Sequence, residues 1–190
     1  MRKYILLFFI SLFQFYSSSA QFYKSIVPSP EFTKTLEKIV LDFRFNYNNI
    51  KGNSLMQEGG TETFESSIKL PGSQDCSITY YSSKVDTSAS WQAILYKGTD
   101  YQEAVRIYQN VFRMVKKSHL NWIDRTLMRF TGTLDSPKEE IGFATSILQL
   151  DLDDVRYKKF AAEIELVSNS YDNFEVHLNL QNRKNDNEQF

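Results

Sequence analysis

The segment TDYQEAVRIYQNVFRMVKK, residues 99–117, decides the fold of this chain. Thr99 or Asp100 can cap a first helical turn, and Lys116 and Lys117 lie in the last turn, where cations complement the helix dipole. The segment therefore predicts an amphipathic helix that packs one stripe against a second layer. The residues of that stripe recur at helical spacing: Tyr101, Ala104, Val105, Tyr108, Val111, Phe112 and Val115.

Alternating apolar and polar residues on both sides of this helix predict the strands of the second layer. Three strands are expected before the helix, at 64–70, 76–80 and 88–96, as an antiparallel meander. Four strands are expected after it, at 128–134, 143–152, 160–166 and 174–180. Because polar residues alternate with apolar ones, one face of the sheet should be buried and the other wet or covered by a partner.

An earlier helix opens at Ser29 and Pro30 and is expected to run for about 20 residues before Gly52 stops it. We therefore predict an α+β fold: a two-layer sandwich of one mainly antiparallel sheet of about seven strands, with both amphipathic helices on one face. The predicted order is α-βββ-α-ββββ. Residues 21–180 should form a single domain, and residues 181–190 a disordered polar tail.

The first twenty residues have the pattern of a secretory signal peptide. Arg2 and Lys3 precede an apolar run that is too short to span a bilayer comfortably, and Ser18 and Ala20 occupy the two positions that a signal peptidase reads. We expect cleavage before Gln21 and a mature protein that is periplasmic or secreted. No later apolar run approaches 18 residues, so the mature form is expected to have no transmembrane segment.

Composition narrows the classes of partner. Of the 22 basic residues, Arg2 and Lys3 belong to the predicted leader, which leaves 20 against 23 acidic residues and a net charge of −3. This balance gives no reason to expect nucleic acid as a partner. Cys76 is the only cysteine, so the exported chain is expected to be held together by its core, without an internal disulfide.

Residues suited to catalysis or metal binding are few, and we predict no catalytic residue, metal site or cofactor. His119 and His177 are far apart in sequence, and His177 is expected on the polar face of the last strand. Cys76 shares the parity of core residues and is interpreted as a buried structural thiol. The acidic run Asp151–Asp154 offers oxygen ligands for Ca²⁺, but it lacks the spacing of an EF-hand loop and is interpreted as a charged strand end.

Three aromatic residues fit the predicted core less well, namely Tyr81, Tyr96 and Trp122. Tyr81 and Tyr96 have the parity of the outer sheet face, where aromatic residues either bind a partner or stabilise the sheet through cross-strand pairs. We therefore predict an exported, non-catalytic domain that binds a protein, peptide or small ligand through these residues. Two alternatives stay open: a hydrolase-like enzyme whose acidic or tyrosine residues converge only in the fold, and a self-associating envelope component.

Overall fold

The computed structural model describes residues 23, 25–82, 87–138, 141–168 and 173–183. The predicted signal peptide at 1–20, its cleavage point before Gln21 and residues 184–190 of the predicted tail lie outside these residues.

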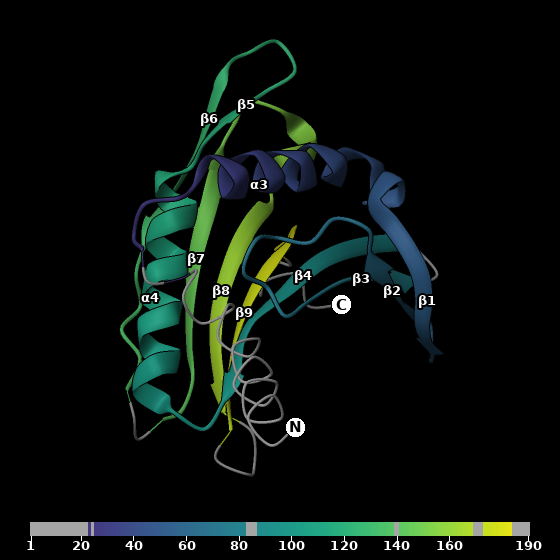
Figure 1. Cartoon of the computed structure of the whole chain (residues 1–190). Coiled ribbons are helices and arrows are strands. Elements are labelled where there is room, and N and C mark those ends of the chain that lie inside the picture. Colours follow the sequence, from purple (N-terminus) through teal and green to yellow (C-terminus); the bar gives the residue numbers. More distant parts are fainter. Residues whose placement is uncertain (1–22, 24, 83–86, 139–140, 169–172, 184–190) are drawn as a thin grey trace, which may run out of the picture.

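The described residues form two α-helices, nine strands and three short 3₁₀ helices. In chain order these are α3 (Pro30–Asp42), η2 (Phe43–Phe45), η3 (Asn48–Ile50), β1 (Lys51–Glu58), β2 (Thr61–Ser66), β3 (Asp75–Ser82), β4 (Thr87–Gly98), α4 (Tyr101–Lys117), β5 (His119–Asn121), β6 (Leu127–Thr133), β7 (Ala144–Asp151), η4 (Val155–Tyr157), β8 (Phe160–Ser168) and β9 (Phe174–Asn182). All nine strands belong to one antiparallel sheet with the order β1-β2-β3-β4-β9-β8-β7-β6-β5. Figure 1 shows this sheet curving strongly from β7 round to β1.

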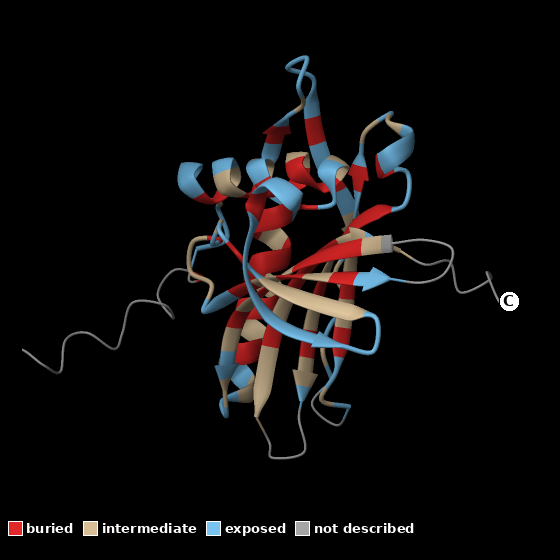
Figure 2. Ribbon diagram, turned by 90° about the vertical axis from the view of Figure 1, so that its right-hand side faces the viewer, coloured by how far each residue is buried: buried red, intermediate tan, exposed pale blue. Residues whose placement is uncertain are grey.

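The predicted class, an α+β fold with one large antiparallel sheet and two helices, is confirmed, and the described residues contain nine strands where about seven were predicted. The two strands that the sequence did not reveal are β1 and β5. Every residue of β1 is exposed, as Figure 2 shows, so this edge strand has no apolar alternation to detect. β5 has only three residues, which is too short for a periodic pattern.

The first helix is also shorter than predicted, because α3 ends at Asp42 and two 3₁₀ helices follow it. Asn46 and Tyr47 adopt positive φ angles of 51° and 59°, which a right-handed helix does not allow. The apolar stripe nevertheless continues, since Phe43, Tyr47 and Ile50 are buried. The helical spacing of apolar residues therefore predicted which side chains are buried, even after the residue at which the helix ends.

The second helix agrees with its prediction. Asp100 is the N-cap, and its carboxylate accepts a hydrogen bond of 3.1 Å from the backbone N–H of Glu103. The buried stripe of α4 lies against the sheet and contacts β4, β6, β8 and β9. The sheet face that α4 covers is called the inner face below, and the opposite one the outer face.

Both helices share one core with the inner face. Trp91 of β4 is fully buried there, and its indole N–H donates a 2.9 Å hydrogen bond to Oγ of Ser66. Tyr47 donates to the backbone carbonyl of Leu180 at 2.7 Å, which ties the segment after α3 to β9. Phe43 and Phe160 pack with ring centroids 4.6 Å apart and connect the end of α3 to β8.

The last strand is longer than predicted. β9 continues through Gln181 and Asn182, and the backbone N–H of Arg183 donates to the carbonyl of Lys159 at 2.8 Å. The first residues of the predicted tail therefore belong to the sheet, and their side chains are available to build a site.

Candidate functional site

Tyr81 lies on the outer face, as its parity predicts. Its neighbours along β3, Cys76, Ile78 and Tyr80, are buried on the inner face, and the Tyr81 side chain is 44% exposed. It pairs across the sheet with Ser88 of β4. Tyr81 is therefore an accessible aromatic residue on an otherwise polar surface.

Tyr96 does not join it there, and its predicted place on the outer face is wrong. A β-bulge interrupts the pairing of β4 with β9 between Ile94 and Tyr96, so that Tyr96 lies opposite Val176 of the buried face. The Tyr96 ring packs against the core, and its hydroxyl donates a 3.2 Å hydrogen bond to the carbonyl of Asp100. Burial raises the pKa of Tyr96, and its bond to the backbone of Asp100 partly offsets that rise.

Trp122 is separate from both tyrosines. It follows β5, is partly buried, and makes an edge-to-face contact with Tyr157, with ring centroids 5.2 Å apart. Tyr157 in turn donates to the backbone carbonyl of Val40 at 2.8 Å. Trp122 thus stabilises the contact between β5, η4 and α3, and the three aromatic residues predicted as one site do not come together.

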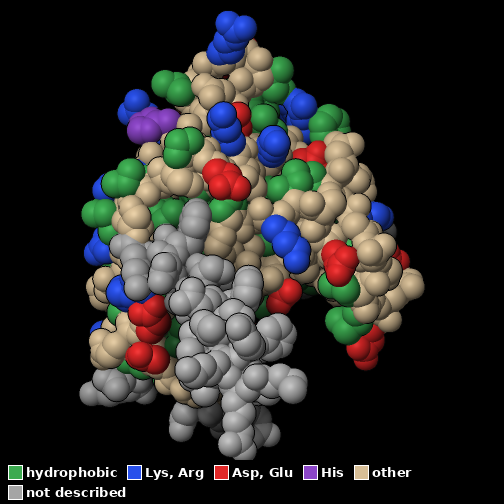
Figure 3. Space-filling view, in the orientation of Figure 1, with side chains coloured by type: hydrophobic (Ala, Val, Ile, Leu, Met, Phe, Trp, Pro, Cys, Tyr) green, Lys and Arg blue, Asp and Glu red, His purple; other side chains and the backbone are tan. Residues whose placement is uncertain are grey.

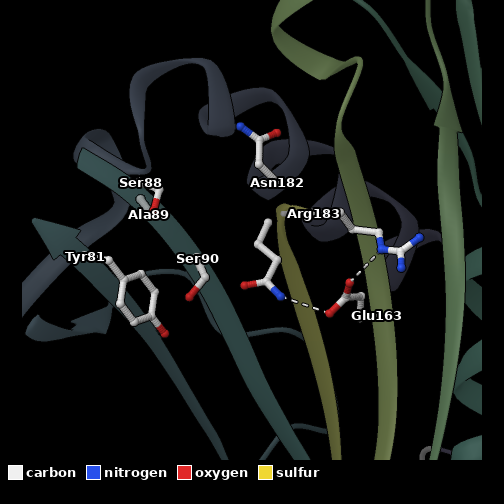
Figure 4. A pocket seen from close by; sticks show the side chains of 8 residues that line it. Tyr81, Ser88, Ala89, Ser90, Glu163, Asn182 and Arg183 are labelled. Carbon is white, nitrogen blue, oxygen red and sulfur yellow. Dashed lines mark hydrogen bonds and ion pairs between the residues drawn. The ribbon is translucent and has the colours of Figure 1, made fainter. Parts of the chain in front are cut away.

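The structure instead contains a cleft at the place where β4 and β9 diverge. The ladder between these strands begins at the pair Trp91 and Leu180, and the preceding part of β4 has no partner in β9. Paired strands are about 4.8 Å apart, so only such a divergence leaves room between them. The resulting cleft has a volume of about 310 Å³ and is lined by Tyr81, Ser88, Ala89, Ser90, Glu163, Gln181, Asn182 and Arg183 (Figure 4).

Several polar groups in this cleft are not used by the fold. Within the described part of the chain, no hydrogen bond involves the hydroxyls of Tyr81, Ser88 and Ser90 or the side-chain amide of Asn182. Ser90 is only 9% exposed, so the cleft is where its hydroxyl can find a partner. Among the described residues, the fully buried side-chain polar atom without a partner is Nε of Arg44, so the Ser90 hydroxyl is open to solvent or to a ligand from the cleft.

The charged groups of the cleft are paired with each other. Gln181 donates from Nε2 to Oε2 of Glu163 at 2.9 Å, and Nε of Arg183 lies 3.6 Å from Oε1 of the same carboxylate. Figure 4 shows both interactions on the side of the cleft away from Tyr81. Glu163 and Arg183 neutralise each other, so the cleft presents hydrogen-bonding groups without a net charge.

The outer face beside the cleft is polar and internally bonded, as the alternation predicts. Asn179 of β9 accepts from Gln92 at 2.9 Å and donates to Glu165 at 2.7 Å. His177 lies on this face as predicted, 2.9 Å from the carboxylate of Glu175. Lys97 also binds Glu175 at 2.8 Å, and this ammonium group lowers the pKa of Glu175. These side chains satisfy one another, in contrast to the hydroxyls of Tyr81, Ser88 and Ser90 in the cleft.

The other residues considered for chemistry have structural environments. Cys76 is buried, its Sγ lies 3.1 Å from Oγ of Ser73, and burial raises the pKa of its thiol. The Asp154 carboxylate binds the guanidinium of Arg156 at 2.6 Å, which lowers the pKa of Asp154 to about 2. Among the described residues, no three His, Cys, Asp or Glu side chains converge as metal ligands would. His119 is exposed on β5, opposite Arg129.

On the face that Figure 3 displays, surface charge does not single out another region. Figure 3 shows cationic and anionic side chains interspersed over the face that it displays, in agreement with the net charge of −1 for the whole chain. Neither helix of the described residues is long and apolar enough to cross a membrane.

Comparisons with protein-family models, with curated proteins and with solved structures gave no match for this chain. Its function is therefore inferred from the cleft alone.

Most residues of the cleft were missed at the level of the sequence. Ser88 and Ser90 have the outer-face parity of Gln92, and Gln181 and Arg183 have that of His177 and Asn179. This parity was a usable signal for the outer face. The cleft forms where β4 and β9 diverge. The sequence of neither strand shows where their pairing ends.

Proposed function

We propose that this protein is an exported, non-catalytic domain that binds a small polar ligand in the cleft between β4 and β9. The observation that carries the proposal is the set of unbonded groups in a concave site, which includes the hydroxyl of Ser90, a residue that is only 9% exposed. Ligand sites combine a concave shape with a few convergent polar groups, and a volume of about 300 Å³ is at the small end of their range. The ligand is therefore expected to be small rather than a folded protein.

The lining favours binding over catalysis. It includes one carboxylate, Glu163, which Gln181 and Arg183 already hold. Acid–base hydrolysis of the glycosidase type needs two carboxyl groups in different protonation states. A single neutralised carboxylate supports orientation of a ligand, and for this reason we do not propose the enzyme alternative.

A ligand screen by thermal shift tests the proposal. A ligand that binds only the folded state raises the melting temperature, and the rise grows with the logarithm of the ligand concentration relative to Kd. We expect a hit from a library of small polar molecules on the wild-type protein, and a weaker shift for Ser90→Ala. Ser77→Ala is the matched control, because Ser77 of β3 lies on the outer face of the sheet, as Ser90 of β4 does, but does not line the cleft.

Two results would contradict the proposal: no hit in the library, or equal shifts for wild type and Ser90→Ala. Export is tested separately by N-terminal sequencing of the protein secreted from its host. We expect the mature chain to begin at Gln21, and an intact Met1 on the exported protein would contradict the predicted leader.

A further inference from the structure

We propose that the ligand of this cleft is a neutral carbohydrate that stacks on Tyr81, an inference that rests on the proposed binding function. The first observation is the position of the Tyr81 ring. Figure 4 shows it standing at one side of the cleft, with Ser90 in the middle and Glu163 on the far side. A flat, accessible ring in this position offers an apolar surface to one side of a ligand while polar groups meet the other side.

A sugar ring has the same division. The C–H groups of a pyranose gather on one face and pack on aromatic rings, whereas its hydroxyls point outward around the ring. A ligand that was apolar throughout would leave the hydroxyls of Ser88 and Ser90 unbonded, at a cost in affinity. A ligand that was polar throughout would gain little from the Tyr81 ring.

The unbonded groups also match hydroxyls in their hydrogen-bonding capacity. Each serine hydroxyl can donate and accept. A sugar hydroxyl donates and accepts as well, so neighbouring hydroxyls on the ligand can satisfy Ser88 and Ser90, which lie on the outer face of β4 opposite Tyr81 and Thr79. Asn182 has the parity of the buried Leu178 and Leu180, and Figure 4 shows it apart from the two serines.

Charge argues against the other small polar ligands. An anionic ligand held by Arg183 would also meet the like charge of Glu163, and an ammonium group held by Glu163 would also meet the like charge of Arg183. A neutral ligand meets no like charge and leaves the ion pair and the bond from Gln181 intact.

The test is a ¹H–¹⁵N NMR titration of the purified protein with two panels of compounds. One panel holds neutral mono- and disaccharides, and the other holds amino acids, dipeptides and nucleosides. We expect saccharides alone to shift the amide signals of Ser88, Ser90 and 181–183. Tyr81→Ala should weaken the best saccharide about tenfold, which corresponds to about 1.4 kcal/mol, and Tyr81→Trp should retain its binding.

The control is Phe143→Ala, since Phe143 is an aromatic residue of similar exposure that precedes β7 and does not line the cleft. If only the second panel shifts the amide signals of the cleft residues, the carbohydrate proposal is wrong and the proposed binding function remains. An absence of cleft shifts with both panels would overturn both proposals. Saccharide shifts confined to residues outside the cleft would overturn the assignment of the carbohydrate to this site.

Discussion

The two faces of the sheet use serine and tyrosine side chains in opposite ways. On the inner face these groups are buried and bonded: Ser66 accepts from Trp91, and Tyr47 donates to the carbonyl of Leu180. On the outer face, at the divergence of β4 and β9, the hydroxyls of Ser90 and Tyr81 line a cleft and have no partner among the described residues.

This difference separates residues that stabilise the fold from residues that are free to bind. A buried polar group of a stable protein is almost always hydrogen-bonded, because leaving it unpaired costs free energy. The two inner-face bonds follow this rule. The cleft hydroxyls can be reached from solvent and need no partner within the fold, so they are free to bond a molecule that enters this concave site, and the cleft is therefore preferred to the core as the candidate site.

The largest expected effect comes from the inner face. Trp91→Ala removes a fully buried indole and its hydrogen bond to Ser66, and it should lower the free energy of unfolding by about 3–5 kcal/mol. Denaturant titration measures this loss. Gln92→Ala, at the next position but on the outer face, should cost about 1 kcal/mol. Equal losses would contradict the division between the faces.

The next largest difference in unfolding free energy is expected between the two tyrosines predicted for the outer face, Tyr81 and Tyr96. Tyr96→Ala removes a ring that packs against the core beside the bulge, and it should cost about 2 kcal/mol of unfolding free energy. Tyr81→Ala should change it by no more than about 0.5 kcal/mol, because the ring is accessible and unbonded. Thermal and denaturant unfolding of both variants measure these two losses. A larger loss for Tyr81→Ala than for Tyr96→Ala would contradict the conclusion that the bulge places Tyr96 against the core.

A matched pair of serines sharpens the comparison. Ser66→Ala leaves the Trp91 indole N–H without an acceptor and should cost about 1–2 kcal/mol. Ser90→Ala removes a hydroxyl that the fold does not use, and the free energy of unfolding should stay within about 0.5 kcal/mol of wild type. If Ser90→Ala proves as costly as Ser66→Ala, its hydroxyl belongs to the structure and not to the site.

The smallest effect is a pH dependence on the bonded part of the outer face. Lys97 and His177 hold the pKa of folded Glu175 below its ordinary value of 4.5. The stability that this carboxylate contributes is therefore present above about pH 4.5 and is lost as the pH falls through the lower, folded pKa. Glu175→Gln should flatten this part of the curve of melting temperature against pH. Glu58→Gln, on the exposed strand β1, should leave it unchanged.

The sequence predicted those features that a periodic pattern records. The stripe of α4 and the alternation in β4, β7, β8 and β9 required one buried sheet face, and the structure has it. The exposed edge strand β1 has no such pattern and was missed. The end of α3 was misplaced because Phe43, Tyr47 and Ile50 stay buried after the helix stops.

The candidate site was predictable only in part, for two physical reasons. A single bulged residue shifts the side-chain parity of a strand, and this moved Tyr96 from the predicted outer face to the core side. The cleft depends on where two strands that are distant in sequence stop pairing, which neither strand's composition records. The position of Tyr81 on the outer face was predicted correctly because β3 pairs with β4 without a bulge from Asp75 to Ser82.

The most direct test of the cleft as a binding site is to measure, on the same samples, ligand affinity by calorimetry and unfolding free energy for wild type and Tyr81→Ala. The ligand is the best saccharide from the titration. We predict that Tyr81→Ala loses about tenfold in affinity while its unfolding free energy stays within about 0.5 kcal/mol of wild type. Unchanged affinity, or a loss of affinity that is matched by a loss of stability, would show that Tyr81 serves the sheet and that the cleft is not the functional site.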